Sequence, residues 1–160
     1  MKVMIGGTFD PLHKGHQLLL QRAFMIAGNC GHVVIGLSAD PFAAHKKHRV
    51  RKYAARWTEL KEWIDKQNFS ATYEIEPLYD HYGSALTQDF DALVVSCETF
   101  PIGNELNRKR RELGKAMVEI YQIPCVFAED GKAISSTRIY RGEIDRYGKA
   151  IVEEDFLTAE

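Results

Sequence analysis

The chain of 160 residues is predicted to have an α/β fold, a doubly wound, five-stranded parallel sheet with helices on both faces. Short apolar runs alternate along the chain with longer segments whose apolar residues recur at helical spacing. Strands and helices that alternate in this way form right-handed βαβ units, as in Rossmann-like folds. Because the sequence has no internal repeat and no low-complexity linker, residues 1–160 are expected to form a single domain.

The first βαβ unit is expected at the start of the chain. An apolar strand over 2–5 leads into two glycines, and a helix is predicted over 17–27. The sequence GNCG at 28–31 ends that helix, because glycine is favoured just beyond a helix C-terminus. A second buried strand is predicted over 32–37.

The rest of the chain continues the alternation. The predicted elements are a helix over 53–65, a strand over 71–77, a strand over 91–96, a basic helix over 104–114, a fifth strand within 117–128 and a helix that begins near 135. The strand over 71–77 ends in a proline and is expected towards a sheet edge. The tail, 148–160, is expected to be a short helix or a frayed end.

Composition gives no reason to expect a nucleic acid or a membrane as a partner. The formal net charge is −1, and the sequence pI is about 6.6. The longest apolar run is far shorter than the ~20 residues that a membrane-spanning helix needs. The first residues resemble a strand and a turn more than a signal peptide, so none is expected.

The three cysteines, Cys30, Cys97 and Cys125, are odd in number and widely spaced. They form no CxxC pair, which argues against a zinc site and against a disulfide framework. This pattern fits a reducing compartment, so a cytoplasmic location is expected.

The segment from Gly6 to His16, GGTFDPLHKGH, lies between a predicted strand and a predicted helix. A helix N-terminus offers unpaired N–H groups and a partial positive charge, which suit phosphate. His13 and His16 are three residues apart and share a helix face, and Thr8 adds a hydroxyl. In a doubly wound sheet the loops after the strands converge at one edge, so this segment is expected to meet Ser and Thr groups from later loops.

Other chemistries are less well supported by the sequence. Asp10 precedes a helix, and we expect it to cap that helix rather than to act in catalysis. The sequence has neither GxxxxGK[ST] nor GxGxxG, so a P-loop or a dinucleotide fingerprint is not expected. Paired carboxylates and a Ser–His–Asp order are also lacking.

Two motifs resemble a known superfamily. The segment from Gly7 to His16 resembles the first signature of the nucleotidylyltransferases, of TxxxxHxGH type, and ISSTR at 134–138 resembles their second. Three further stretches resemble the phosphopantetheine adenylyltransferases of the archaeal and eukaryotic type. These are VVSCET at 94–99, NRKRR at 107–111 and RGEID at 141–145, so that the likeness spans 2–146.

This resemblance implies adenylyl transfer from ATP to 4′-phosphopantetheine, which gives dephospho-coenzyme A and pyrophosphate. The acceptor phosphate is already a nucleophile, so the enzyme mainly has to hold two polyanions in line and neutralise charge. Mg²⁺ is expected with ATP, held mainly by phosphates and water, and no metal ligand in the chain is predicted.

The resemblance also implies roles for individual residues. Thr8 and His16 would contact the α-phosphate, and Lys47, or else Lys46, would hold the acceptor phosphate. Arg110, or its neighbour Arg111, would hold the β- and γ-phosphates. The full predicted nucleotide-binding set is Gly6, Gly7, Thr8, Phe9, His13, His16, Glu98, Asn107, Arg110, Ser135, Ser136 and Thr137.

Two alternatives remain open at this point. One is a sister enzyme with another acceptor, such as nicotinamide mononucleotide or the phosphate of a small alcohol. The other is a nucleotide-binding regulatory module without catalysis. The oligomeric state is not indicated by the sequence.

Overall fold

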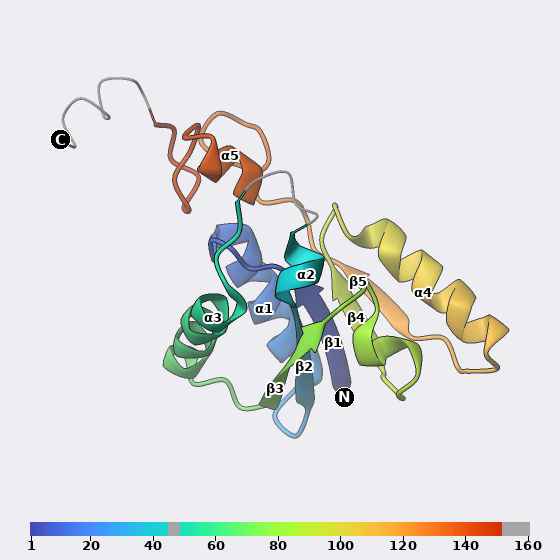
Figure 1. The fold of residues 1–160 in the computed structure, drawn as a ribbon. Coiled ribbons are helices and arrows are strands. Elements are labelled where there is room, and N and C mark those ends of the chain that lie inside the picture. Colours follow the sequence, from blue (N-terminus) through green and yellow to red (C-terminus); the bar gives the residue numbers. More distant parts are fainter. Residues whose placement is uncertain (45–48, 152–160) are drawn as a thin grey trace.

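The computed structural model describes residues 1–44 and 49–151. Its centre is a five-stranded sheet in the order β3-β2-β1-β4-β5, in which every neighbouring pair is parallel (Figure 1). The strands are β1 (Lys2–Gly7), β2 (His32–Ser38), β3 (Thr72–Leu78), β4 (Ala92–Val95) and β5 (Glu119–Gln122). The predicted five-stranded parallel sheet is therefore confirmed, with β3 at an edge as its proline suggested.

Helices cover both faces of this sheet. Successive strand residues point to opposite faces, so Val3 and Ile5 join one core while Met4 joins the other. The first core lies under α1 (Lys14–Ala27) and α3 (Tyr53–Gln67), and the second lies under α4 (Phe100–Glu112) and the 3₁₀ helix η1 (Gly83–Leu86). Figure 1 shows α1 and α3 on one side of the strands and α4 on the other.

A small lobe follows β5 and lies beyond the carboxyl ends of the strands (Figure 1). It contains α5 (Ser136–Tyr140) and a core of its own, made by Ala128, Ile134 and Ile144. Two isolated bridges, Phe127 with Ala133 and Ile144 with Ala150, close it. Residues 152–160 of the predicted tail lie outside the described residues.

Several element boundaries differ from the predictions. Helix α1 begins at Lys14 rather than near 17, because the His13 side chain caps it. β5 is only four residues long, since Pro124 lacks the N–H that would continue the ladder. α5 ends at Tyr140, and Ile144, which follows it in the chain, is buried in the lobe core. The short helix α2 (Asp40–Ala43) was not predicted.

The cysteine prediction was wrong in one respect, because Cys97 and Cys125 form a disulfide. Cys97 follows β4 and Cys125 follows β5, and these strands are parallel neighbours. Their outgoing loops therefore lie side by side, a proximity that the 28-residue separation in sequence does not reveal. With Cys97 and Cys125 bonded, the cysteines no longer indicate a reducing compartment, and a cytoplasmic location stays a prediction.

Within 1–44 and 49–151, no helix is both long enough and apolar enough to span a membrane.

Candidate functional site

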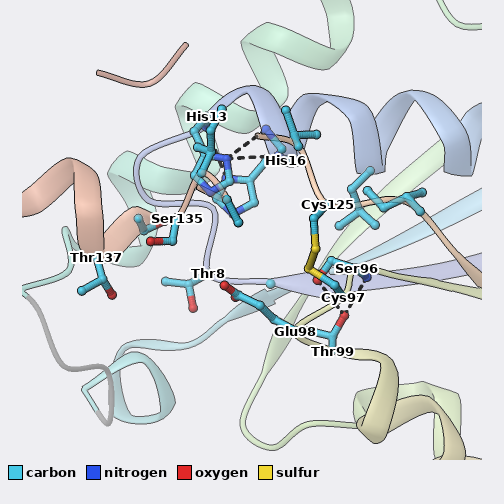
Figure 2. A pocket seen from close by; sticks show the side chains of 18 of the residues that line it. Thr8, His13, His16, Ser96, Cys97, Glu98, Thr99, Cys125, Ser135 and Thr137 are labelled. Carbon is cyan, nitrogen blue, oxygen red and sulfur yellow. Dashed lines mark hydrogen bonds between the residues drawn. A yellow bond between two sulfur atoms is a disulfide. The ribbon is translucent and has the colours of Figure 1, made fainter. Parts of the chain in front are cut away.

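A cavity of about 500 Å³ opens at the carboxyl ends of β1, β4 and β5. This is where the strand order reverses, since β2 and β3 lie on one side of β1 and β4 and β5 on the other. The cavity brings together nine of the predicted residues: Gly6, Gly7, Thr8, His13, His16, Glu98, Ser135, Ser136 and Thr137. In the view of Figure 2, Ser135 and Thr137 of the second signature lie to the left of His16 and Thr8 of the first.

His13 is the N-cap of α1. Its Nδ1 accepts hydrogen bonds from the backbone N–H groups of Gly15 at 3.0 Å and His16 at 3.3 Å. The Nδ1 of His16 in turn lies 3.3 Å from the backbone nitrogen of His13, which completes a reciprocal capping box. The two rings stack with their centroids 3.6 Å apart (Figure 2).

Because its Nδ1 accepts two N–H groups, the ring of His13 carries its proton on Nε2. Burial lowers the pKa of His13 from 6.5 to about 4. His13 is therefore neutral near pH 7 and offers an N–H donor rather than a positive charge.

Gly15 is required by the close approach of the His13 ring. A Cβ atom at this position would lie 2.9 Å from Cε1 of His13 and 3.1 Å from its Nδ1. The glycine of the HKGH sequence therefore makes room for the capping ring, a reason that only the structure shows.

Thr8 is oriented from the neighbouring strand. Its hydroxyl donates to Oγ of Ser38 at 3.2 Å, and Ser38 donates to the carbonyl oxygen of Gly7 at 3.3 Å. The carbonyl oxygen of Thr8 accepts a hydrogen bond from Nη1 of Arg56, a side chain with no exposed surface. Neither supporting residue is predicted from the sequence, because Ser38 belongs to β2 and Arg56 to α3, and both meet Thr8 only in the folded chain.

The second signature forms the start of α5. Ser135 is the N-cap and accepts a hydrogen bond from the backbone N–H of Arg138 at 3.2 Å. The side chain of Arg138 bonds to Asp130, to Glu143 and to the carbonyl oxygen of Ala133, so it holds the small lobe together.

Phe9 does not line the cavity. It is buried, has a positive φ of 51°, and its ring lies 5.0 Å from that of His16 between centroids. It supports His16 from the protein interior instead of contacting a ligand directly.

The expectation that Arg110 binds phosphate needs correction. Its guanidinium is buried and donates to the carbonyl oxygens of Ala85, Gln88 and Ala116 at 2.6 to 2.7 Å. These bonds tie α4 to the segments around it. The alternative, Arg111, is exposed and borders a separate surface hollow on α4.

Asn107 also has a structural role. Its side-chain amide donates to the carbonyl oxygen of Val118 at 2.9 Å and accepts from the Val118 N–H at 2.8 Å. It borders the same hollow on α4 and not the large cavity. The resemblance of NRKRR at 107–111 to a family motif implied a nucleotide contact, and a sequence does not reveal backbone partners of this kind.

Lys47, and the alternative Lys46, lie outside the described residues. Their predicted contact with the acceptor phosphate stays a prediction.

The structure adds lining residues from the segments after β4 and β5. The backbone N–H of Ser96 donates to Oγ1 of Thr99 at 2.9 Å, which closes the turn that presents Glu98 (Figure 2). The Cys97–Cys125 disulfide lines the same wall. The VVSCET stretch marked the residues after β4, but nothing in the sequence indicated that Cys125 would lie beside them, because they meet through the pairing of β4 with β5.

A second, smaller cavity of about 130 Å³ lies next to the first. Its walls are mostly apolar and include Met4, Phe42, Leu78, Tyr82, Leu93 and Ile102. Gly6, Gly7, Thr8 and Thr99 border both cavities. Thr8 therefore lies between the two cavities, of which the smaller has the more apolar lining.

The sequence of this chain was compared with those of known protein families. The cytidylyltransferase-like family matches residues 4–142. The chain belongs to the cytidylyltransferase-like family.

Relatives within this group are similar over almost the whole chain. The phosphopantetheine adenylyltransferase of Methanosarcina acetivorans is 47% identical over 149 residues, which cover 92% of this chain and 94% of the relative. The enzyme of the same name from Archaeoglobus fulgidus is 42% identical, over 94% of this chain and 100% of the relative. The resemblance to phosphopantetheine adenylyltransferases that the motifs indicated is thereby confirmed.

A solved structure supports the fold. A protein of unknown function from Archaeoglobus fulgidus superposes with a TM-score of 0.70 at 36% identity, over 77% of this chain and 89% of its own.

Proposed function

We propose that this member of the cytidylyltransferase-like family is a phosphopantetheine adenylyltransferase of coenzyme A biosynthesis. It transfers AMP from ATP to 4′-phosphopantetheine and produces dephospho-coenzyme A and pyrophosphate. Relatives that carry this name match more than nine-tenths of the chain at 42–47% identity. The position of Thr8 between the two cavities is the observation in this chain that best supports the proposal.

The larger cavity would take ATP. It combines the N-terminus of the 14-residue helix α1 with His13, His16 and the hydroxyls of the second signature. The imidazole N–H groups and the hydroxyls are hydrogen-bond donors suited to a triphosphate, and the positive end of the α1 dipole favours an anion. ATP would enter with Mg²⁺, which favours phosphate and water oxygens over dedicated protein cages.

The smaller cavity would take the pantetheine arm of the acceptor. Its apolar walls, with Tyr82 and Phe42, suit an uncharged chain better than a second nucleotide. Because the two cavities meet at Thr8, an acceptor seated there would place its phosphate next to the α-phosphate of ATP.

The reaction would be a direct in-line transfer. An oxygen of the acceptor phosphate attacks the α-phosphorus, and the bond to the bridging oxygen of the β-phosphate breaks, so pyrophosphate leaves. No general base is needed, because the acceptor oxygen is already an anion. His16 and Thr8 would stabilise the charge that develops on the α-phosphate, and Lys47 would hold the acceptor phosphate.

The test is turnover with purified protein, ATP and Mg²⁺, with pyrophosphate release as the measurement. We expect release with 4′-phosphopantetheine and not with nicotinamide mononucleotide. The opposite pattern would refute the proposed acceptor. Binding of ATP without turnover of any acceptor would favour the regulatory module. We also propose a cytoplasmic location, where coenzyme A synthesis would occur.

A further inference from the structure

Asp10 is a buried acid within the first signature that the proposed reaction does not use. The sequence suggested that it caps α1, but His13 takes that position. Asp10 borders the large cavity, yet its side chain has no exposed surface. A buried carboxylate is costly unless it is fully hydrogen-bonded, so its partners indicate why it is there.

Asp10 receives three hydrogen bonds from the part of the chain that the structure describes. The backbone N–H of Arg51 donates to Oδ2 at 2.7 Å and its Nε donates to Oδ1 at 2.6 Å. The hydroxyl of Tyr140 donates to Oδ2 at 2.7 Å. The acid is thus held on one side by the segment that enters α3 and on the other by the last residue of α5.

The bond to Tyr140 joins residues 130 positions apart. Asp10 lies in the loop that carries Thr8 and leads to His16, and Tyr140 ends the helix that begins with Ser136. The two signatures form different walls of the nucleotide cavity. One carboxylate therefore links the wall that would hold the α-phosphate with the wall that would hold the outer phosphates.

The charge states of Asp10 and Tyr140 favour the hydrogen bond between them. Burial alone would raise the pKa of Asp10, but hydrogen bonds from Arg51 and Tyr140 outweigh it and lower the pKa. Burial and the neighbouring carboxylate raise the pKa of Tyr140 to about 12. Near neutral pH the acid is ionised and the phenol is protonated, which gives a charge-assisted hydrogen bond.

A second connection reinforces the first. Arg51 also pairs with Glu59 at 2.9 Å, and Glu59 contacts Arg146 of the small lobe at 3.3 Å. The backbone N–H of Lys14 donates to the carbonyl oxygen of Arg146 at 2.9 Å. The lobe therefore contacts the first signature at Lys14 as well as at Asp10, and the Asp10 contact is made with α5 itself.

We propose that Asp10 is a positioning residue, whose bond to Tyr140 sets the distance between the two walls of the nucleotide cavity. This inference rests on the proposed use of that cavity for ATP. Loosening the bond would let α5 move relative to Thr8 and His16. The affinity for ATP would fall, because ATP would contact both walls. The affinity for an acceptor bound in the smaller cavity would not change.

The test compares Tyr140→Phe, Asp10→Asn and the double variant with the unaltered chain. We expect Tyr140→Phe to raise the KM for ATP about tenfold, as for loss of one charge-assisted hydrogen bond. The KM for phosphopantetheine should change little, and the thermal midpoint should fall by a few degrees, because the buried carboxylate keeps its bonds from Arg51 but loses the one from Tyr140. The double variant should bind ATP no worse than Asp10→Asn alone, since the two changes break the same contact. Tyr147→Phe, at an exposed tyrosine of the same lobe, is the matched control.

Calorimetric titration with ATP keeps this test separate from the proposed function. If the unaltered chain binds ATP but does not turn over phosphopantetheine, the proposed acceptor fails, and the affinity of Tyr140→Phe for ATP still decides the role of Asp10. An unchanged ATP affinity in folded Tyr140→Phe, or additive effects in the double variant, would overturn the positioning role. Failure of the unaltered chain to bind ATP would overturn it too.

Discussion

The rings of His13 and His16 stack 3.6 Å apart, while the Nδ1 of His13 accepts the backbone N–H of His16. The residue that caps α1 is therefore also a wall of the cavity. Helix start and candidate phosphate site are one structure, so changes to the HKGH sequence should affect stability and activity to different degrees, depending on the residue.

We expect His16→Ala to lower kcat by about 10²- to 10³-fold with a smaller effect on ATP affinity, as for loss of one donor to a developing charge. Steady-state kinetics and ATP titration measure the two effects. His32→Ala is the control, since His32 starts β2 at the opposite end of the sheet. Unchanged turnover in His16→Ala would contradict its assigned role.

Stability should fall as the pH falls from about 6.5 to about 4. The folded-state pKa of His13 is lowered to about 4 by burial, so the unfolded chain binds a proton in this range that the folded chain does not. The contribution of His13 to the free energy of unfolding is fully present above pH 6.5. It falls by about 3 kcal/mol as the pH approaches 4, when no other group titrates in this range.

Urea unfolding at several pH values measures this. His13→Asn, which keeps a capping side chain but does not titrate, should flatten the pH dependence. A variant with the same slope as the unaltered chain would show that other groups cause it.

Gly15→Ala should destabilise the chain although alanine favours helices. The added Cβ would lie 2.9 Å from Cε1 of His13 and displace the cap, which costs about 1–2 kcal/mol. Thermal unfolding measures the loss. Lys14→Ala, at the exposed neighbouring position, is the control and should be close to neutral. A more stable Gly15→Ala variant would argue against the tight ring contact.

Arg110→Met should lower the free energy of unfolding and leave the KM for ATP unchanged. The substitution removes the buried guanidinium that donates to three carbonyl oxygens. The free energy of unfolding should therefore fall by about 3 kcal/mol or more. Denaturant unfolding and the KM for ATP separate the two effects, with the exposed Arg111→Met as the control. A rise in the KM for ATP with unchanged stability would restore the phosphate-binding role that the sequence suggested.

Replacing Cys97 and Cys125 by serine should lower stability by about 2–4 kcal/mol, because the bond closes a loop across a separation of 28 residues. Unfolding with and without a dithiol reductant provides the measurement. The reductant should destabilise the unaltered chain and leave the double serine variant unchanged. Equal stability of both proteins without reductant would show that the bond does not form in solution.

Much of the fold is already present in local sequence patterns. The apolar strands and helical periodicities are short-range, so they indicated a five-stranded parallel sheet with an edge strand at 71–77. The same holds for the two signatures. Their residues follow strands whose carboxyl ends meet at one edge, and nine predicted residues do line one cavity there.

The errors came from contacts between distant segments. Arg110 and Asn107 bind backbone groups that any sequence provides, so the resemblance of NRKRR to a family motif did not reveal their partners. Cys97 met Cys125 only because β4 pairs with β5.

The sequence by itself determined the class of fold, the position of the site at a strand-to-helix junction and the residue types that line it, because these depend on local pattern and on motif spacing. The tertiary structure alone decided which side chain caps α1, which arginine is buried and which acid joins the two signatures. These features depend on hydrogen bonds of about 3 Å between residues that are far apart in the sequence. Asp10 and Tyr140, which are separated by 130 positions, are an example.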